Sequence, residues 1–145
     1  MHYNCGKGLL PISWARADLG LDGYLCCPGP SLANAPDELR GVGRKIFAIN
    51  TAYPRVRPDI WIGMDKAECY DRQLWHEPFP KICRGGLQHT RIGGKLVCDF
   101  PEVYWASLKA PEPGKTMFDF RNHHDLFLWE KNTLGVALHI MVWMG

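Results

Sequence analysis

Three short apolar runs in this chain each end in residues that could hold a small ligand. The runs at 24–27, 46–49 and 60–64 are followed by a Gly-Pro-Ser turn, by Asn50 and by Asp65, respectively. Backbone N–H groups and a hydroxyl at a helix start can hold a phosphate. An amide can bond a base or a ribose, and a carboxylate can bond a ribose hydroxyl or a Mg²⁺ ion beside a phosphate. The residue types therefore suit a nucleotide or a similar small ligand.

The apolar runs themselves indicate which elements position these residues. Short continuous apolar runs bounded by turn signals are typical of strands that are buried on both faces of a parallel sheet. The carboxyl ends of parallel strands meet at one edge, where ligands bind in such sheets. We therefore expect an α/β fold, Rossmann-like, with a mostly parallel sheet, helices on both faces, and one crevice shared by the Gly-Pro-Ser turn, Asn50 and Asp65.

Turn residues and apolar spacing divide the rest of the chain. The predicted elements are strands at about 23–27, 46–50, 60–64, 81–83 and 117–120, helices at 36–40, 65–75 and 133–144, and one or two helical turns within 103–108. The stretch 84–116 is rich in Gly and Pro. It is predicted to be an irregular insertion, either a lid or a surface excursion.

The last predicted helix, 133–144, is apolar almost all round, and such a helix is buried. Gly145 is a residue type that commonly caps a helix. A crossover helix in a parallel sheet leads into a further strand, and none follows here. We therefore interpret residues 1–145 as a single nucleotide-binding domain that is the N-terminal part of a larger, incomplete domain, or whose sheet is completed by a second copy in a homo-oligomer.

Composition excludes several classes of partner. The chain of 145 residues has a formal net charge of +2, and its basic residues are scattered, which argues against nucleic acid. No apolar stretch approaches the roughly 18 residues needed for a membrane span. The N-terminus lacks the basic start and apolar middle of a signal peptide, so a cytoplasmic location is expected.

The residues that could bind metals do not form a recognisable site. None of the six cysteines lies in a Cys-x-x-Cys pair, and buried free thiols are expected. The richest cluster is His123-His124-Asp125. Adjacent histidines point to different sides of any regular element, so a polar loop is preferred and no metal site is predicted. No nucleophile–base pair can be identified from spacing, and the catalytic residues stay unknown.

The turn at 29–31 has two interpretations. It could hold a phosphate, or it could be only a tight turn between a strand and a helix. Because Pro30 has no N–H, a phosphate cradle would depend on the N–H groups of Ser31, Leu32 and Ala33.

Asn50 and Asp65 also have structural interpretations beside their functional ones. Asn50 could contact a nucleotide or cap the next turn. Asp65 could bind a ribose hydroxyl or a Mg²⁺ ion, or it could be the N-cap of the helix expected at 65–75.

The order of four segments resembles a known superfamily. The segments are Cys27-Pro-Gly-Pro-Ser-Leu32, Ala48-Ile-Asn50, Pro58-Asp-Ile-Trp-Ile-Gly-Met-Asp65 and the run from Asn132 to Gly145. They resemble the bacterial CMP-sialic-acid-dependent sialyltransferases of the lipooligosaccharide type. They are similarly like the motility-accessory-factor proteins of flagellin glycosylation and the archaeal pterin pyrophosphokinases, which share a Rossmann-like core. The resemblance covers about 23–65 and 132–145.

The resemblance implies roles for eight residues. They are a phosphate-side turn of Gly29, Pro30, Ser31 and Leu32, a nucleotide contact by Asn50, Asp65 on the same edge, and Thr133 with Gly135 at the start of the last helix. The implied ligand is a nucleotide or nucleotide sugar, with a CMP-type nucleotide sugar as donor substrate, and no cofactor is assigned.

The implied function is a nucleotide-sugar-dependent glycosyltransferase that inverts the sugar as it transfers it. A base would deprotonate the acceptor hydroxyl while the site stabilises the departing phosphate. Pro28 stands where the sialyltransferases usually have Asn, and their catalytic His lies beyond the point where this chain ends. We therefore expect nucleotide binding without transferase activity. The alternatives are pyrophosphoryl transfer to a pterin, which needs Mg²⁺ and several carboxylates, and a catalytically silent binding module.

Overall fold

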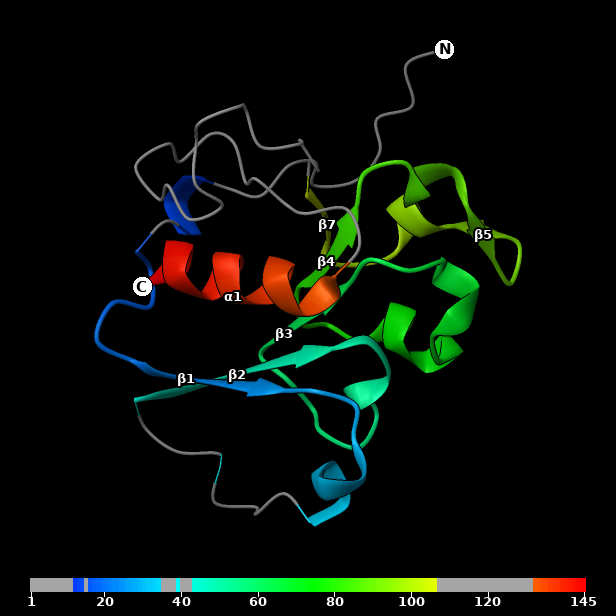
Figure 1. Ribbon diagram of the computed structural model, residues 1–145. Helices are drawn as coiled ribbons and strands as arrows, with labels where there is room; N and C mark the ends of the chain where they lie inside the picture. The colour runs from blue at the N-terminus through cyan, green and yellow to red at the C-terminus, as the bar shows by residue number, and fades with distance from the viewer. Residues whose placement is uncertain (1–11, 15, 35–38, 40–42, 107–131) are drawn as a thin grey trace.

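The computed structural model describes residues 12–14, 16–34, 39, 43–106 and 132–145 (Figure 1). Five strands form one parallel sheet in the order β1-β2-β3-β4-β7: β1 (Asp22–Cys26), β2 (Arg44–Ile49), β3 (Ile60–Gly63), β4 (Lys81–Arg84) and β7 (Val103–Ala106). The predicted α/β class and the parallel sheet are confirmed.

The inner strands are apolar because both of their faces are covered. Every residue of β3 and of β7 is buried, and so are the last four residues of β2. Alternate residues of β2 belong to different clusters: Ile46 and Ala48 pack on one face, and Phe47 and Ile49 pack on the other. This two-sided burial explains the continuous apolar runs in the sequence.

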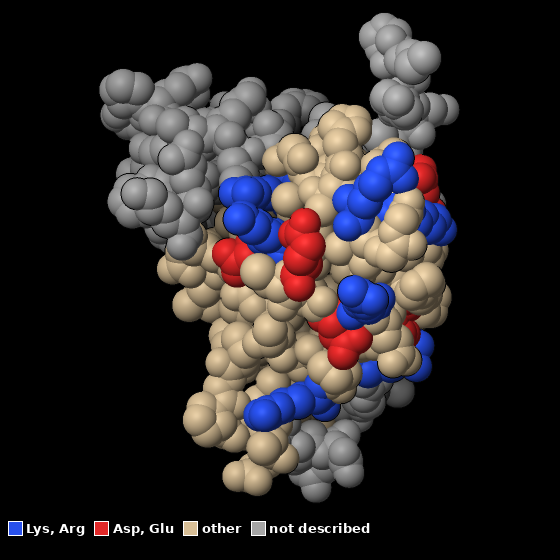
Figure 2. All heavy atoms as spheres, turned by 90° about the vertical axis from the view of Figure 1, so that its right-hand side faces the viewer, with Lys and Arg blue, Asp and Glu red and all other residues tan. Residues whose placement is uncertain are grey.

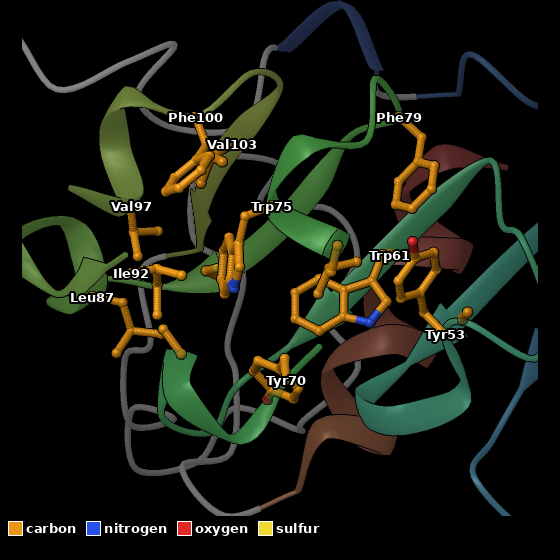
Figure 3. Close-up of a cluster of buried hydrophobic side chains, with 14 of the residues drawn as sticks. Tyr53, Trp61, Tyr70, Trp75, Phe79, Leu87, Ile92, Val97, Phe100 and Val103 are labelled. Carbon is orange, nitrogen blue, oxygen red and sulfur yellow. The ribbon is translucent and has the colours of Figure 1, made fainter. Parts of the chain in front are cut away.

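One face of the sheet is covered by the connections between strands. The strands follow one another across the sheet in chain order, and right-handed crossovers then put successive connections on the same side. These connections contain short 3-10 helices: η2 (Pro30–Asn34), η4 (Asn50–Ala52), η5 (Ala67–Cys69), η6 (Arg72–His76), η7 (Leu87–His89) and η8 (Val97–Asp99). Buried side chains from these helices and from the loops beside them form an aromatic-rich layer with Trp61 of β3, which we call the connection layer (Figure 3).

The opposite face is covered by α1 (Thr133–Met144). Val136, Ala137, Ile140 and Trp143 pack on the side of the sheet that carries Phe47. The helix runs antiparallel to the strands, so its N-terminal end lies toward the carboxyl edge of the sheet (Figure 1). Its other end is fixed by the 16–18 segment, whose N–H groups at Arg16 and Asp18 donate to the carbonyls of Trp143 and Met144, at 2.9 Å each.

The stretch 84–106 is more ordered than its sequence suggests. After β4 come η7, a small antiparallel hairpin of β5 (Arg91–Ile92) and β6 (Lys95–Leu96), and then η8. The hairpin turn places Gly93 and Gly94 at positive φ, of 57° and 86°. Ile92, Val97 and Phe100 are buried in the connection layer. This part of the stretch is therefore a packed portion of the domain.

Two predicted elements were wrong. The helix expected at 65–75 is replaced by η5 and η6, because Asp71 turns its carboxylate to the N–H of Gln73, at 2.8 Å, and starts a new turn there. The helical turns expected within 103–108 are instead strand β7, which adds to the edge of the sheet beside β4.

Several expectations lie outside the described residues. They are the helix at 36–40 apart from Leu39, the strand at 117–120, Cys5 and the His123–Asp125 cluster. Among the five described cysteines none forms a disulfide, and Cys26, Cys83 and Cys98 are buried. In the described part of the chain, no helix is both long enough and apolar enough to cross a membrane.

Candidate carboxyl-edge site

Three of the predicted segments leave the sheet at the same edge. β1 leads into η2, β2 into η4, which begins at Asn50, and β3 ends two residues before Asp65. Because β1, β2 and β3 are adjacent and parallel, these segments follow the carboxyl ends of neighbouring strands. Figure 2 views the molecule from this side, and basic and acidic side chains are interspersed on it rather than separated into fields of one sign.

Asn50 is held in an uncommon backbone conformation. Its φ of 49° lies in the left-handed region, which Asn tolerates better than most residues. The indole Nε1–H of Trp61 donates to the Asn50 main-chain carbonyl at 2.9 Å. The side-chain Oδ1 of Asn50 accepts a long hydrogen bond of 3.5 Å from the Tyr70 hydroxyl. The backbone and the side chain of Asn50 are thus each fixed by an aromatic residue of the connection layer.

Tyr70 links Asn50 to Asp65. The backbone N–H of Asp65 donates to the Tyr70 hydroxyl at 2.8 Å, so that hydroxyl accepts from one strand end and donates to the other. The Asp65 carboxylate is exposed and makes no hydrogen bond or ion pair with the described residues. Burial raises the pKa of Tyr70, which keeps the hydroxyl protonated and able to donate.

This geometry decides what Asn50 can offer to a ligand. A phenol has one proton, and Tyr70 directs it to Asn50 Oδ1. The Nδ2 of Asn50 is then the end of the amide left for another molecule, and it carries two donors. Asp65 offers only acceptors when ionised. The two strand ends therefore present a donor group and an acceptor group that Tyr70 ties together.

Gly63 is the residue that lets this arrangement form. A Cβ at Gly63 would lie 2.0 Å from Cη2 of Trp61 and 2.8 Å from the Tyr70 hydroxyl. The Trp61 ring therefore lies directly over Gly63, and it contacts the Tyr70 ring edge-on with centroids 4.7 Å apart (Figure 3). Only glycine leaves room for both aromatic rings at the end of β3.

The turn at 29–31 sits at the same edge and is fixed by its own backbone. The N–H of Leu32 donates to the carbonyl of Gly29 at 3.0 Å, so this N–H closes the turn. Leu32 also packs against the connection layer, while Ser31 and Ala33 are exposed. Of the three donors expected for a phosphate cradle, those of Ser31 and Ala33 lie on exposed residues.

Thr133 and Gly135 lie at the N-terminal end of α1, as predicted. Asn132 is the N-cap, and its side chain accepts from the N–H of Leu134 at 2.9 Å. Thr133 is buried, and a Cβ at Gly135 would meet nothing within 4 Å. No hydrogen bond among the described residues joins this helix end to Asn50 or Ser31. Between the different segments of the predicted site, the hydrogen bonds of the described residues therefore connect only Asn50 and Asp65, through Tyr70.

Sequence reasoning missed Tyr70 and Trp61 as parts of this site. Tyr70 fell inside an expected helix, where its position suggested no partner. The one available signal was Gly63, two residues after Trp61 and therefore on the same face of the strand. A glycine there indicates close approach of another group.

A second missed residue, Lys81, lies at the other end of the sheet. It is fully buried at the start of β4, and its ammonium donates to the carbonyls of Glu77 and Phe79. Burial lowers its pKa from 10.5 to about 8. Because backbone carbonyls bond this ammonium and bury it, its role is structural.

Metal ligation finds no support in the described residues. Within 12–14, 16–34, 39, 43–106 and 132–145 there is no group of three or more His, Cys, Asp or Glu side chains that could hold an ion. Asp65 belongs to the hydrogen-bonded network through its backbone N–H and brings one carboxylate to it.

Comparison with known proteins identifies no relative of this chain. No protein-family model, no curated protein and no solved structure matched it.

Proposed function

We propose that this domain binds a nucleotide or nucleotide sugar of the CMP type at the carboxyl edge of β1, β2 and β3. The observation that carries the proposal is the hydrogen-bonded chain from Asp65 through Tyr70 to Asn50. It holds an amide donor and an exposed carboxylate on adjacent strand ends, where parallel sheets bind ligands.

The chemistry of these two groups suits a pyrimidine nucleotide. Asn50 Nδ2 can donate to a base carbonyl, a ring nitrogen or a phosphate oxygen, which are all acceptors. The Asp65 carboxylate can accept from the two hydroxyls of a ribose. The resemblance adds the turn of Gly29, Pro30, Ser31 and Leu32 on the phosphate side, and Thr133 with Gly135 at the helix end.

Sugar transfer from a CMP-type donor is the reaction that the resemblance implies. It needs a general base for the acceptor hydroxyl, and we assign that role to no described residue. Pyrophosphoryl transfer to a pterin is disfavoured, because it needs several carboxylates around Mg²⁺ and the network carries one, Asp65. The cytoplasmic location stays a prediction from the sequence.

The proposal is tested by calorimetric titration with CMP, CDP, UDP, ATP and GTP. We expect CMP and the other pyrimidine nucleotides to bind, and the purine nucleotides to bind more weakly. Asn50→Gly removes the amide and relieves the left-handed backbone, so it should weaken binding by about tenfold without unfolding the domain. Asn50→Asp keeps the shape but replaces donors with acceptors, and it should weaken binding further.

Arg55→Ala is the matched control, because Arg55 is exposed in the β2–β3 connection and its loss also lowers the net charge. It should leave the affinity within about twofold of the original. A protein that binds none of the five nucleotides, or binds them equally after both Asn50 substitutions, would show the site to be misplaced.

A further inference from the structure

The exposed large apolar side chains of the described residues are few, and all of them lie on α1 or in the segment that enters β1. They are Leu19, Leu21, Leu134, Leu138 and Val142, and between 39% and 72% of each is exposed. The last three recur every four residues along α1 and therefore form one stripe on the helix. Leu19 and Leu21 lie in the segment that enters β1. We call these five residues the β1-side patch.

The patch lies on the side of the molecule formed by β1. Val142 lines a cavity of about 200 Å³ together with Leu21 and Gly23, so this end of the stripe overhangs the start of β1. Leu134 and Leu138 continue the same stripe along the helix. In Figure 1, β1 and α1 face the viewer together, while β4 and β7 recede behind them.

Among the described residues, the edge of β1 beside this patch has no strand paired with it. β1 pairs with β2 on one side, and no described strand pairs with its other side. An open edge carries unpaired N–H and carbonyl groups that can add another strand. Backbone groups and apolar side chains suited to an interface therefore coincide on one side.

We propose that this side is a homodimer interface in which β1 pairs antiparallel with β1 of a second copy. The two-fold axis would stand perpendicular to the sheet and pass through Tyr24, the middle residue of β1. Such an axis reverses strand direction but keeps each face of the sheet on its own side. The two sheets then continue into one, and the two α1 helices meet antiparallel on the same face.

The positions of residues along β1 and along α1 are consistent with one two-fold axis for both elements. Gly23 lies under Met141, because a Cβ on Gly23 would be 2.8 Å from the Met141 methyl carbon. One strand residue advances about 3.3 Å and one helix residue about 1.5 Å, so one strand step equals about two helix residues. Since α1 runs antiparallel to β1, Tyr24 comes level with about residue 139, next to Leu138.

This coincidence makes the patch self-complementary, as a two-fold interface requires. Leu138 would face its own copy near the axis, and Leu134 would face Val142 of the second copy. α1 carries no charged side chain, so the two helices meet without repulsion. The one acid of β1, Asp22, would lie opposite residue 26 of the other strand rather than opposite its own copy. These features favour a second copy over an unrelated partner.

The first experiment measures molar mass by light scattering after size exclusion, over a range of protein concentrations. A 16.5 kDa chain should elute as a species of twice that mass. Leu138→Glu puts two carboxylates near the axis and should raise the dissociation constant by about a hundredfold or more. The control Arg72→Glu introduces the same residue at an exposed position of η6, on the opposite face of the sheet from α1, and should leave the mass unchanged. Circular dichroism reports whether each variant is folded.

The second experiment tests the strand register. Directly opposed residues of antiparallel strands have Cβ atoms about 4.5–5.5 Å apart, which suits a disulfide after small adjustment. In a background of Cys5→Ser, Cys27→Ser and Cys69→Ser, Tyr24→Cys should form a covalent dimer on mild oxidation, and Arg72→Cys should not. A monomer at high concentration overturns the proposal. A dimer that persists in Leu138→Glu and does not cross-link at position 24 also overturns the proposal, because such a dimer would be held together by another interface. Neither result depends on nucleotide binding.

Discussion

Replacing Lys81 by Met should change how the stability of this protein depends on pH. The Lys81 side chain is fully buried, and its ammonium contacts the carbonyls of Glu77 and Phe79 and the face of the Phe79 ring, 5.3 Å from the ring centroid. These contacts do not replace all of the hydration that the charge loses. Burial therefore lowers the pKa of Lys81 from 10.5 in the unfolded chain to about 8.

The sign of the effect follows from proton binding. Between pH 8 and pH 10.5 the unfolded chain holds a proton on Lys81 that the folded protein has largely released. Stability rises with pH wherever the unfolded state binds more protons. Below pH 8 both states are protonated, and the full cost of burying the charge applies. The difference between 10.5 and about 8 corresponds to about 3 kcal/mol, and most of this should be recovered between pH 7 and pH 10.

Other groups titrate in the same range with the opposite sign. Burial raises the pKa of Cys83 and of Cys26, so the unfolded chain loses these protons first and stability falls as pH rises. Burial also raises the pKa of Tyr53 to about 12, which acts above pH 10. Because these thiols stay protonated when folded with or without Lys81, their effect cancels in the difference between the original protein and Lys81→Met.

The assay is urea denaturation with a reducing agent, at pH 7, 8, 9 and 10, on both proteins. The original protein should gain about 2–3 kcal/mol relative to Lys81→Met between pH 7 and pH 10, with most of the gain above pH 8. Leu74→Met, a similar-sized change at a buried position of the connection layer, is the control and should run parallel to the original at all four pH values. A pH-independent difference for Lys81→Met would refute the reasoning, because Lys81 would then titrate equally in both states.

Five further substitutions, at four positions, test local features by the same denaturation method. Gly63→Ala should lower the free energy of unfolding by about 2–3 kcal/mol, because its Cβ would overlap the Trp61 ring. Gly135→Ala, whose Cβ would meet nothing within 4 Å, should instead stabilise α1 by up to about 1 kcal/mol. Equal effects of the two substitutions would contradict the packing described at β3. Asn132→Ala removes the cap on the Leu134 N–H and should cost about 1 kcal/mol, while Asn132→Asp should cost little. Asp59→Ala removes the acceptor of the Ile46 N–H, at 2.7 Å, and should cost about 1–2 kcal/mol; a neutral result would mean that water replaces this bond.

The strands could be predicted from the sequence because a strand that is buried on both faces is apolar at consecutive positions. Ile60-Trp-Ile-Gly63 is apolar at every position, and every position is buried. The helices on the connection face could not be predicted in the same way. A 3-10 turn of three to five residues has no periodicity to read, and its position depends on single groups such as the Asp71 carboxylate.

The sequence predicted which strand ends form the site, but it did not predict the hydrogen bonds through Tyr70 that connect them. Asn50 and Asp65 were expected at one edge because parallel strands end together, and the structure connects them. The connection passes through Tyr70, which lies five residues beyond Asp65 and reaches back over Gly63. That contact depends on where the Trp61 ring packs, and ring packing is a property of the folded connection layer rather than of local sequence.

The order of the strands limits where a ligand can contact the predicted residues together. In doubly wound sheets the ligand crevice opens where neighbouring connections leave toward opposite faces. In the described residues all the connections from β1 to β7 pack on one face, so Asn50 and Asp65 belong to that side. Thr133 approaches the same edge from the other face, on α1.

A ligand held by Asn50 and Asp65 must therefore extend across the carboxyl edge of the sheet to reach Thr133. The proposed function places the base and the ribose at Asn50 and Asp65, so a contact with Thr133 is left to the phosphate or the sugar that a nucleotide carries beyond them. Substitution of Asn50 or Asp65 should thus weaken binding of every pyrimidine nucleotide. Thr133→Val, which deletes a hydroxyl at nearly constant volume, should weaken binding only of the longer ligands. Equal losses for CMP and for a CMP-linked sugar would mean that Thr133 does not lie on the ligand's path.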